Sequence, residues 1–326
     1  VGADIRLFRS RLNLDIAYYD SESKNQIVSM PVSQASGVGN RYSNTGRIRN
    51  WGWEVSANGT LVKTKKVQWK AYVNWALNRN RVLELGDGVD SWIVASYSSH
   101  AYMTAYKGGS LSAMYGLGYK RAPEGAYIVE KDGSITNVSG QIIVDENGYP
   151  QYSDELQYIG ECTPDWKGGF GTSVNFRGFD LSVAFTYQIG GLAYDSGYSA
   201  AMYSPANKTT GMNWHKDMLD AWSADNTSSN IPRLQYEDKD QNGMSDRFLM
   251  DASYLNLQNI NFGYTLPSNF TKKVGIEKVR VYLACENVWY WSKRQGFDPR
   301  YSYSGSTSQA TYSPVRTISG GINIQF

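Results

Sequence analysis

The sequence predicts an all-β protein, the C-terminal portion of a transmembrane antiparallel β-barrel. Three observations carry this prediction. Apolar and polar residues alternate along several segments, aromatic residues and glycine are abundant, and the connections between the segments are alternately short and long. A membrane barrel needs a row of side chains facing lipid, a row facing the lumen, and aromatic rings at both membrane interfaces.

The last twelve residues, 315–326, show the alternation most clearly. Ile318, Ile322, Ile324 and Phe326 fall on one face of a strand, and polar residues fall on the other. Few soluble sandwiches end on an exposed aromatic residue, whereas a membrane strand uses one at the interface. This ending also resembles the C-terminal signal by which bacterial outer-membrane barrels are recognised for assembly.

The composition fits the same class. The 326 residues include 25 Tyr, 10 Trp, 10 Phe and 32 Gly, and two aromatic girdles account for such a content. The mean hydropathy of −0.48 agrees, because half of each barrel strand and the external loops are polar. No run of 18 apolar residues occurs, which excludes a transmembrane helix. The net charge of +2 gives no reason to expect a nucleic-acid partner.

Nine strands are predicted, and the segments between them are read as connections. The strands cover about 2–8, 11–27, 46–60, 67–78, 170–176, 179–189, 255–264, 279–291 and 315–326. The apolar row changes parity in the seventh strand, which predicts a β-bulge near Gln258 and Asn259. Residues 28–45 read as a loop. The Asp132-Gly133 and Asn147-Gly148 pairs predict small hairpins inside a long connection at 81–165.

The lengths of the connections predict an orientation. Barrels of this class have short periplasmic turns and longer extracellular loops, so a periplasmic C-terminus places every short turn on that side. Nine antiparallel strands cannot close as a bacterial single-chain barrel, so further strands are expected upstream. Residues 1–326 are therefore predicted to form the C-terminal part of one barrel domain. The chain begins at Val1, without Met and without the signal peptide that export requires.

Aromatic residues near the strand ends predict two membrane girdles. The expected periplasmic belt contains Trp69, Phe176, Phe179, Tyr264 and Phe326, and the expected extracellular belt contains Trp51, Trp53, Tyr187, Trp289 and Trp291. The apolar residues between the belts, such as Val183 and Leu283, are expected to face outer-membrane lipid.

Several stretches resemble the SusC family, the TonB-dependent outer-membrane transporters of Bacteroidetes. They are SYLNLQNINFGYTLP at 253–267, VRVY at 279–282, ENV at 286–288, GFDP at 296–299 and NTGRIRNWG at 44–52. A further match joins 168–171 to 178–181. The similarity spans nearly the whole chain and is most specific from 253 to 299.

The resemblance implies a 22-stranded barrel, of which these would be the last nine strands. It also implies an N-terminal plug and a TonB box, neither of which lies in residues 1–326, and a SusD-like surface lipoprotein that closes over the barrel. TonB would then act through the missing N-terminal region. Glycans are the commoner cargo of the family and peptides a substantial minority, and the aromatic loops tilt the expectation towards glycan.

The second long connection, 191–249, holds a cluster of aromatic residues that are candidates for contact with substrate or with the lipoprotein lid. They are Tyr194, Tyr198, Tyr203, Trp214 and Trp222. An apolar ring face is costly to leave in water, so it suits sugar stacking or a protein partner. The alternative is that the loop packs on its own aromatic residues.

The same connection contains a candidate Ca²⁺ loop. Asp238, Asp240, Asn242 and Asp246 follow the spacing of positions 1, 3, 5 and 9 of an EF-hand. The twelfth position is Leu249 in place of the bidentate Glu, so a solvated acidic loop is favoured over a metal site. No other cofactor is expected. Cys162 and Cys285 make no metal cluster and read as two unrelated small residues, with a disulfide left open.

The functional hypotheses are ranked by these observations. His100 and His215 have no nucleophile or metal spacing around them, and nothing in the sequence indicates an enzyme. The leading hypothesis is active import of oligosaccharides or oligopeptides through an energised gate. A passive porin is the alternative, and a structural or adhesive surface barrel is a third class.

Overall fold

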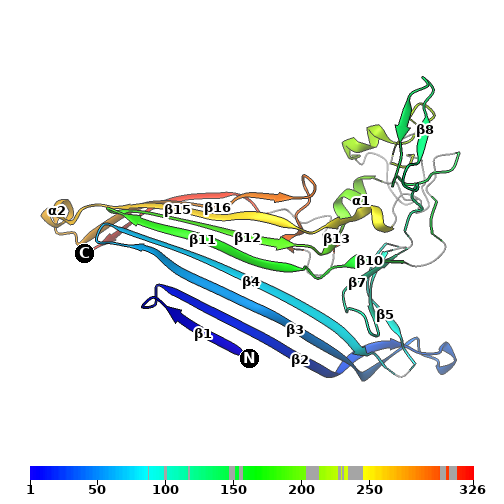
Figure 1. Ribbon diagram of the computed structural model, residues 1–326, viewed down its shortest axis with the longest axis horizontal. Helices are drawn as coiled ribbons and strands as arrows, with labels where there is room; N and C mark the ends of the chain where they lie inside the picture. Colours follow the sequence, from blue (N-terminus) through cyan, green and yellow to red (C-terminus); the bar gives the residue numbers. More distant parts are fainter. Residues whose placement is uncertain are drawn as a thin grey trace.

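One curved antiparallel sheet dominates the structure, a computed structural model (Figure 1). The structure describes residues 1–86, 88–98, 101–116, 118–146, 151–153, 157–202, 213–226, 229, 231–233, 245–301, 306–307 and 314–326. Within them, nine strands pair in the order β1-β2-β3-β4-β11-β12-β15-β16-β18. Their bounds are β1 Gly2–Leu7, β2 Leu12–Pro31, β3 Asn40–Lys63, β4 Val67–Glu84, β11 Trp166–Phe176, β12 Phe179–Ile189, β15 Tyr254–Thr265, β16 Lys278–Ser292 and β18 Thr317–Gln325. The nine predicted strands are thus confirmed.

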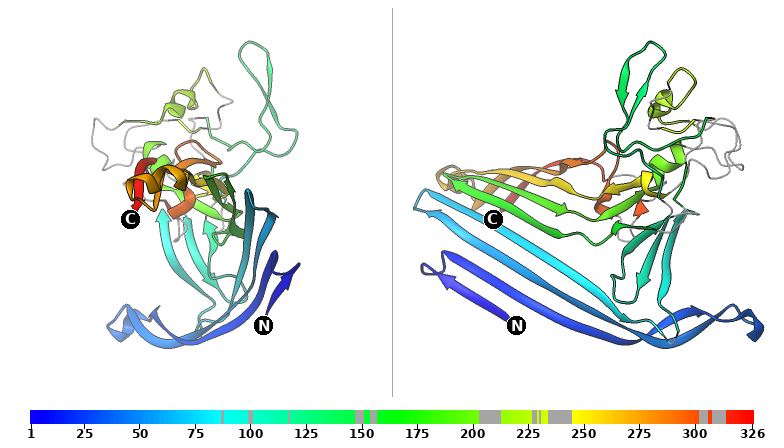
Figure 2. Two further views of the ribbon diagram at one scale, coloured as in Figure 1. Left: turned by 90° about the vertical axis from the view of Figure 1, so that its left-hand side faces the viewer. Right: turned by 45° about the vertical axis from the view of Figure 1, so that its right-hand side comes forward.

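The connections sort by length between the two ends of the sheet. The short ones (residues 8–11, 64–66, 177–178 and 266–277) lie at the end that also holds the C-terminus, where α2 (Ser268–Thr271) and η4 (Lys272–Val274) form (Figure 1). The long ones lie at the opposite end, and we call them the loop layer (Figure 2).

The loop layer has secondary structure of its own. Its strands are β5 Ser91–Ser98, β6 Ala101–Tyr106, β7 Ala113–Gly116, β8 Tyr127–Val129, β9 Ile135–Asn137, β10 Gln157–Glu161, β13 Leu192–Asp195, β14 Leu249–Asp251 and β17 Ser306–Thr307. Its helical turns are η1 Gln34–Ser36, α1 Ser196–Met202, η2 Lys216–Asp220, η3 Ser245–Phe248 and η5 Pro299–Tyr301. The predicted hairpin at Asp132-Gly133 is confirmed as β8–β9, whereas Asn147-Gly148 lies outside the described residues.

Cross-strand partners share a face, and the register separates an apolar row from a polar one. One apolar row reads Leu14, Ala57, Val73, Phe170, Phe185, Leu257 and Trp289 across six strand pairs. The adjacent polar row reads Asn13, Asn58, Tyr72, Gly171, Ala184 and Asn259. The polar row lines a hollow on the sheet, so it marks the concave face, and the apolar row marks the outer face.

A β-bulge resets this alternation in β15. The register shifts between Leu257 and Asn259 in the ladder with β16, and the ladder with β12 shifts at the same place. Gln258 is unpaired in both ladders and is the extra residue opposite β12, whereas opposite β16 it faces two unpaired residues, Asn287 and Val288. The residues of β15 that follow Gln258 keep their apolar members on the outer face. The predicted bulge is confirmed.

Glycines on the concave face accept aromatic rings from neighbouring strands. An ideal Cβ at Gly171 would lie 2.6 Å from the Tyr72 ring, and one at Gly321 would lie 2.6 Å from the Tyr282 hydroxyl. At Gly321 a larger side chain would displace the Tyr282 ring, whereas at Gly171 it would also meet the Val183 carbonyl oxygen of the backbone. Gly171 therefore has the stronger requirement for glycine, because another strand approaches its backbone closely.

The prediction of a loop at 28–45 is wrong, because β2 and β3 remain paired as far as Pro31 and Asn40. β3 has 24 residues, whereas a membrane crossing needs about 9–11. Beyond the crossing no row needs to be apolar, so the backbone ladder continues without alternation. Cross-strand charges stabilise this extension: Arg47 Nε lies 2.6 Å from Glu22, and Arg49 Nε donates to Asp20 at 2.9 Å. β4 likewise extends to Glu84.

Among the described residues, no helix is long and apolar enough to cross a membrane.

We predict that Gly171→Ala destabilises the intact protein. The added methyl group would meet the Tyr72 ring and the Val183 carbonyl oxygen, each at 2.6 Å, and such overpacking costs about 1–3 kcal/mol. Thermal unfolding measures the loss. Gly320→Ala is the matched control, since its nearest neighbour would be 3.6 Å away. Equal losses in both variants would show that the contact with Tyr72 does not require the glycine.

Candidate functional site: the concave wall and the loop layer

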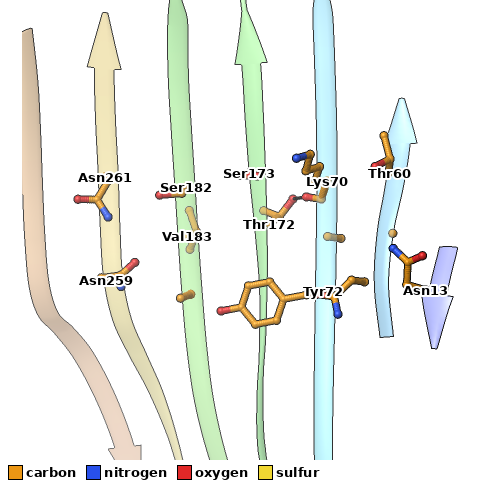
Figure 3. A pocket seen from close by; sticks show the side chains of 14 residues that line it. Asn13, Thr60, Lys70, Tyr72, Thr172, Ser173, Ser182, Val183, Asn259 and Asn261 are labelled. Atoms are coloured by element: carbon orange, nitrogen blue, oxygen red, sulfur yellow. Dashed lines mark hydrogen bonds between the residues drawn. The ribbon is translucent and has the colours of Figure 1, made fainter. Parts of the chain in front are cut away.

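The concave face of the sheet forms a polar hollow of about 530 Å³ at mid-strand (Figure 3). The polar residues that line it come from six strands and are Asn13, Asn58, Thr60, Lys70, Tyr72, Thr172, Ser173, Ser182, Asn259 and Asn261. Amides and hydroxyls predominate, Lys70 is the one charged group among these, and the Tyr72 ring extends across β11 (Figure 3). Such a surface can donate and accept hydrogen bonds with a neutral polar solute.

A second hollow, of about 500 Å³, continues the polar surface towards the loop layer. It is lined by Ser56, Asn74 and Thr186 and adds the charged groups of Asp15, Glu54 and Lys167. Together the two hollows place polar side chains at two successive levels along the concave face of the wall. This arrangement is suited to a hydrated solute that moves along the strands.

At the short-turn end, the concave face carries an ion pair that sequence analysis missed. Arg280 Nε donates to Asp180 Oδ1 at 2.9 Å, and Arg280 Nη2 donates to Asp180 Oδ2 at 2.5 Å. Gly263 lies between them, and a Cβ there would lie 2.4 Å from the guanidinium. The Arg280 guanidinium also lies 5.2 Å from the Tyr282 ring. The partners are 100 residues apart, so only the strand register brings them together.

The loop layer buries part of the predicted aromatic cluster in a core of its own. Tyr194 is 3% exposed and packs with Ala101, Met202 and Phe248. Its hydroxyl shares a hydrogen bond of 2.8 Å with Ser199. A buried ring supports the loop and has no face left for a ligand.

Tyr198 is half-buried beside this core. Its hydroxyl donates to Asp217 at 2.8 Å, and its ring packs edge-on against His215, with centroids 4.8 Å apart. Burial, followed by the hydrogen bond to Asp217, raises the pKa of Tyr198 to about 12.

The other three residues of the predicted aromatic cluster differ in exposure. Trp214 is 38% exposed, Trp222 is partly exposed, and Tyr203 lies outside the described residues. The expectation of ligand or partner contact therefore rests on Trp214 and Trp222.

Two arginines hold the β16–β18 connection against β13 and β15. Arg294 pairs with Asp195, whose side chain is 4% exposed. Arg300 Nη2 pairs with Asp298 at 2.6 Å, and its Nη1 donates to Asn256 at 3.0 Å. Phe297, which is 1% exposed, packs with Ala193 and Ala252. The GFDP stretch at 296–299 thus has a structural role here: it packs the connection against β13 and the beginning of β15.

Arg247 is a buried cation in the loop layer, and no motif in the sequence marked it. Both of its Nη atoms are buried and have no hydrogen-bond partner in the part of the chain that the structure describes. The guanidinium lies 5.2 Å from the Phe248 ring. Burial lowers its pKa, an effect that the nearby Tyr119 and Tyr198 partly offset.

The predicted Ca²⁺ loop stays a prediction. Asp238, Asp240 and Asn242 lie outside the described residues, and Asp246 is described only as part of the η3 backbone. Elsewhere in the described chain, no three His, Cys, Asp or Glu side chains gather as metal ligands. Cys162 and Cys285 are both free thiols, and burial raises the pKa of Cys162 to about 12.

The outer face presents the residues predicted to form the girdles. Trp69, Phe176 and Phe179 are 42–45% exposed near the short turns, and the Phe179 and Tyr264 rings are 4.4 Å apart. Trp53, Trp289 and Trp291 are 45–49% exposed nearer the loop layer. Trp51 is half-buried, and the Arg49 guanidinium lies 5.1 Å from its ring. On β18, Ile318, Ile322 and Ile324 are 50–67% exposed, and Phe326 beyond it is 87% exposed.

We predict that Arg294→Met loosens the loop layer, because Asp195 would be left buried without its partner. Losing one member of a buried ion pair costs about 3–5 kcal/mol. Hydrogen exchange at β13 measures the local opening. The control is Lys131→Met, which breaks a pair with Asp225 whose side chains are 70% and 90% exposed and should leave hydrogen exchange at β13 unchanged, because solvent screens an exposed pair. Unchanged protection of β13 in Arg294→Met would contradict the role given to this pair.

Comparisons with known proteins agree with this geometry. Residues 1–288 match the family described as TonB dependent receptor-like, beta-barrel. TonB-dependent receptor P3 of Formosa agariphila is 28% identical, with 100% of this chain and 33% of the relative aligned. TonB-dependent receptor SusC of Bacteroides thetaiotaomicron is 25% identical, over 100% of this chain and 31% of the relative. The chain spans about a third of the length of these curated relatives.

Solved structures share the fold. The structure of the RagAB peptide transporter superimposes with a TM-score of 0.76 at 24% identity, covering 100% of this chain and 34% of that one. The RagAB peptide importer in its closed-closed state gives 0.75 at the same identity. The predicted fold class and the resemblance to SusC are therefore confirmed, and the chain belongs to the TonB-dependent receptor-like β-barrel family.

Proposed function

We propose that this chain forms part of the wall of a TonB-dependent outer-membrane importer for oligosaccharides or oligopeptides. The observation that carries the proposal is the two-faced wall, with an apolar outer face and a concave face of amides and hydroxyls. The short turns and the C-terminus lie on the periplasmic side, and the loop layer is extracellular. The rest of the barrel, the plug and the TonB box belong to parts of the protein outside residues 1–326.

The chemistry of the concave face supports a neutral polar cargo. Asn, Ser and Thr side chains bind sugar hydroxyls and peptide groups through the same hydrogen bonds. The burial of Tyr194 removes part of the support for a glycan, because that ring has no face left for a sugar. The RagAB neighbours are described as peptide importers. Both cargo classes are therefore part of the proposal, and a measurement of uptake has to distinguish between them.

A SusD-like lipoprotein is the proposed partner of the loop layer. The β8–β9 hairpin projects from that layer (Figure 2) and exposes Tyr127, Val129 and Ile135, which are 62–72% accessible. An isolated two-stranded hairpin is marginally stable in water, and exposed apolar side chains favour a protein contact. A lipoprotein lid over the loop layer would cover this hairpin and Trp214.

We predict that cells carrying the intact protein take up its cargo only while TonB and the proton gradient are intact. Labelled oligosaccharides and oligopeptides are supplied in parallel, and uptake is compared before and after removal of TonB. Because family membership implies an energised gate, the uptake of one cargo class should fall to background. The tagged protein purified from the same cells should bring a lipoprotein with it.

A passive porin is the alternative outcome of this experiment. Uptake that persists unchanged without TonB would contradict active import and favour the porin. Purification of the protein alone from native membranes would contradict the lid.

A further inference from the structure

The short connections carry positive charge that the proposed transport function does not use. Nine cationic residues lie in or beside them: Arg9, Arg11, Lys63, Lys65, Lys66, Arg177, Lys272, Lys273 and Lys278. We call them the basic rim. With Glu277 as the one carboxylate in these segments, they carry a net charge of +8, whereas the whole chain carries +2. The charge of the chain is therefore strongly segregated towards this end.

The residues of the basic rim have no carboxylate partner among the described residues, although Arg177 lies over the Phe176 ring. All nine are exposed. None of them forms an ion pair with another residue that the structure describes. Lys63, Lys65, Lys66 and Arg177 come together around one hollow between neighbouring turns. Asp180 also lines this hollow, but its carboxylate is paired with Arg280. Unpaired like charges repel each other, so an anionic partner would stabilise the rim.

Exposed apolar side chains accompany the cations in every short connection. Phe8 is 73% exposed beside Arg9, and Leu61 is 51% exposed just before Lys63. Phe176 and Phe179 flank Arg177 and are 44% and 45% exposed. In a turn that faces only water, exposed apolar side chains bring no gain in stability. The boundary of a bilayer suits them, because it is apolar on one side and charged on the other.

The connection between β15 and β16 has the same character. Phe270 and Val274 are 69% and 71% exposed, and they are four residues apart across α2 and η4, with Lys272 and Lys273 between them. Side chains four residues apart lie on one side of a helical turn. The segment thus presents an apolar face with two cations beside it.

The cations lie directly beyond the aromatic residues of the outer face. The Arg177 guanidinium is 5.3 Å from the Phe176 ring, and Phe179 and Tyr264 continue the aromatic surface on the next strands. In a membrane, aromatic rings sit at the level of the headgroups, and long cationic side chains reach past them to phosphate. Along the outer face, an apolar band is followed by aromatic rings and then by cations. One leaflet of a membrane has the matching order of acyl chains, headgroup region and phosphate.

We propose that the basic rim binds anionic phospholipid headgroups of the leaflet that the short connections face. This inference rests on the membrane placement given under the proposed function. Each exposed cation near an anionic surface contributes favourably, and the contribution weakens with salt. An acidic soluble protein would pair with the cations but would leave Phe8, Phe270 and Val274 in water, so the lipid is the better fit.

The experiment uses the intact protein in nanodiscs of phosphatidylcholine, with or without phosphatidylglycerol. The rim variant replaces Lys63, Lys65, Lys66, Lys272 and Lys273 with Gln. The matched control replaces five exposed lysines of the opposite end, Lys107, Lys120, Lys131, Lys216 and Lys293, with Gln. Native mass spectrometry counts the phosphatidylglycerol molecules that each protein retains, and thermal unfolding measures the shift that this lipid causes.

The parent and the control variant should retain phosphatidylglycerol and unfold at a higher temperature in its presence. The rim variant should lose more than half of the retained lipid and of the shift. Raising the salt from about 0.1 M to about 1 M should weaken the effect in the parent, because the charges are exposed. The assay needs no TonB, so its failure would leave the import proposal standing.

Two results would overturn the proposal. One is equal retention of phosphatidylglycerol by the rim variant and the parent. The other is an equal stabilisation of the parent by inorganic phosphate, which would indicate a phosphate site in place of a lipid surface. If the rim variant does not fold, the salt dependence of lipid retention by the parent decides, since retention that is unaffected by salt also overturns the proposal.

Discussion

Backbone hydrogen bonding in apolar surroundings is the constraint on which the rest of this structure depends. A strand inside a bilayer has no water to bond its N–H and C=O groups, so each must find a partner on a neighbouring strand. The ladder from β1 to β18 meets this demand for the seven inner strands, whereas β1 and β18 each have a partner on one side only among the described residues. The same ladder sends successive side chains to opposite faces, which places Val73 and Phe170 outside and Tyr72 inside. The polar concave surface and the apolar outer surface thus follow from one pattern of pairing.

The wall was predictable from the sequence because lipid enforces a period of two. All nine strands were found, and the parity change in β15 revealed its bulge. Prediction failed where that constraint ends. Beyond the crossing, β2 and β3 continue as a hairpin with mixed polarity, so the sequence resembled a loop. The Asp180–Arg280 ion pair could not be predicted from the sequence, because the two residues are brought together only by the registers of β12, β15 and β16.

The loop layer follows the rules of a soluble domain, and there sequence analysis could not distinguish a core aromatic residue from a surface one. Tyr194 packs inside with Phe248 and Met202, whereas Phe179 and Trp289 stay exposed on the wall. The same residue types thus occupy opposite environments within one chain. Buried ion pairs replace alternation as the organising contacts, as with Arg294 and Asp195. Such contacts join segments that are far apart in sequence, so no local spacing of residues predicts them.

The most direct test of this account is site-directed spin labelling of β12 in the intact protein, reconstituted in a bilayer, with Cys162 and Cys285 replaced by Ser. Labels are introduced by Leu181→Cys, Ser182→Cys, Val183→Cys and Ala184→Cys, and collisions with oxygen in lipid and a nickel complex in water are compared. The account predicts oxygen accessibility at 181 and 183 and lower oxygen but higher nickel accessibility at 182 and 184, because successive side chains face opposite sides of the wall. Equal accessibility at neighbouring positions, or the opposite phase, would contradict it.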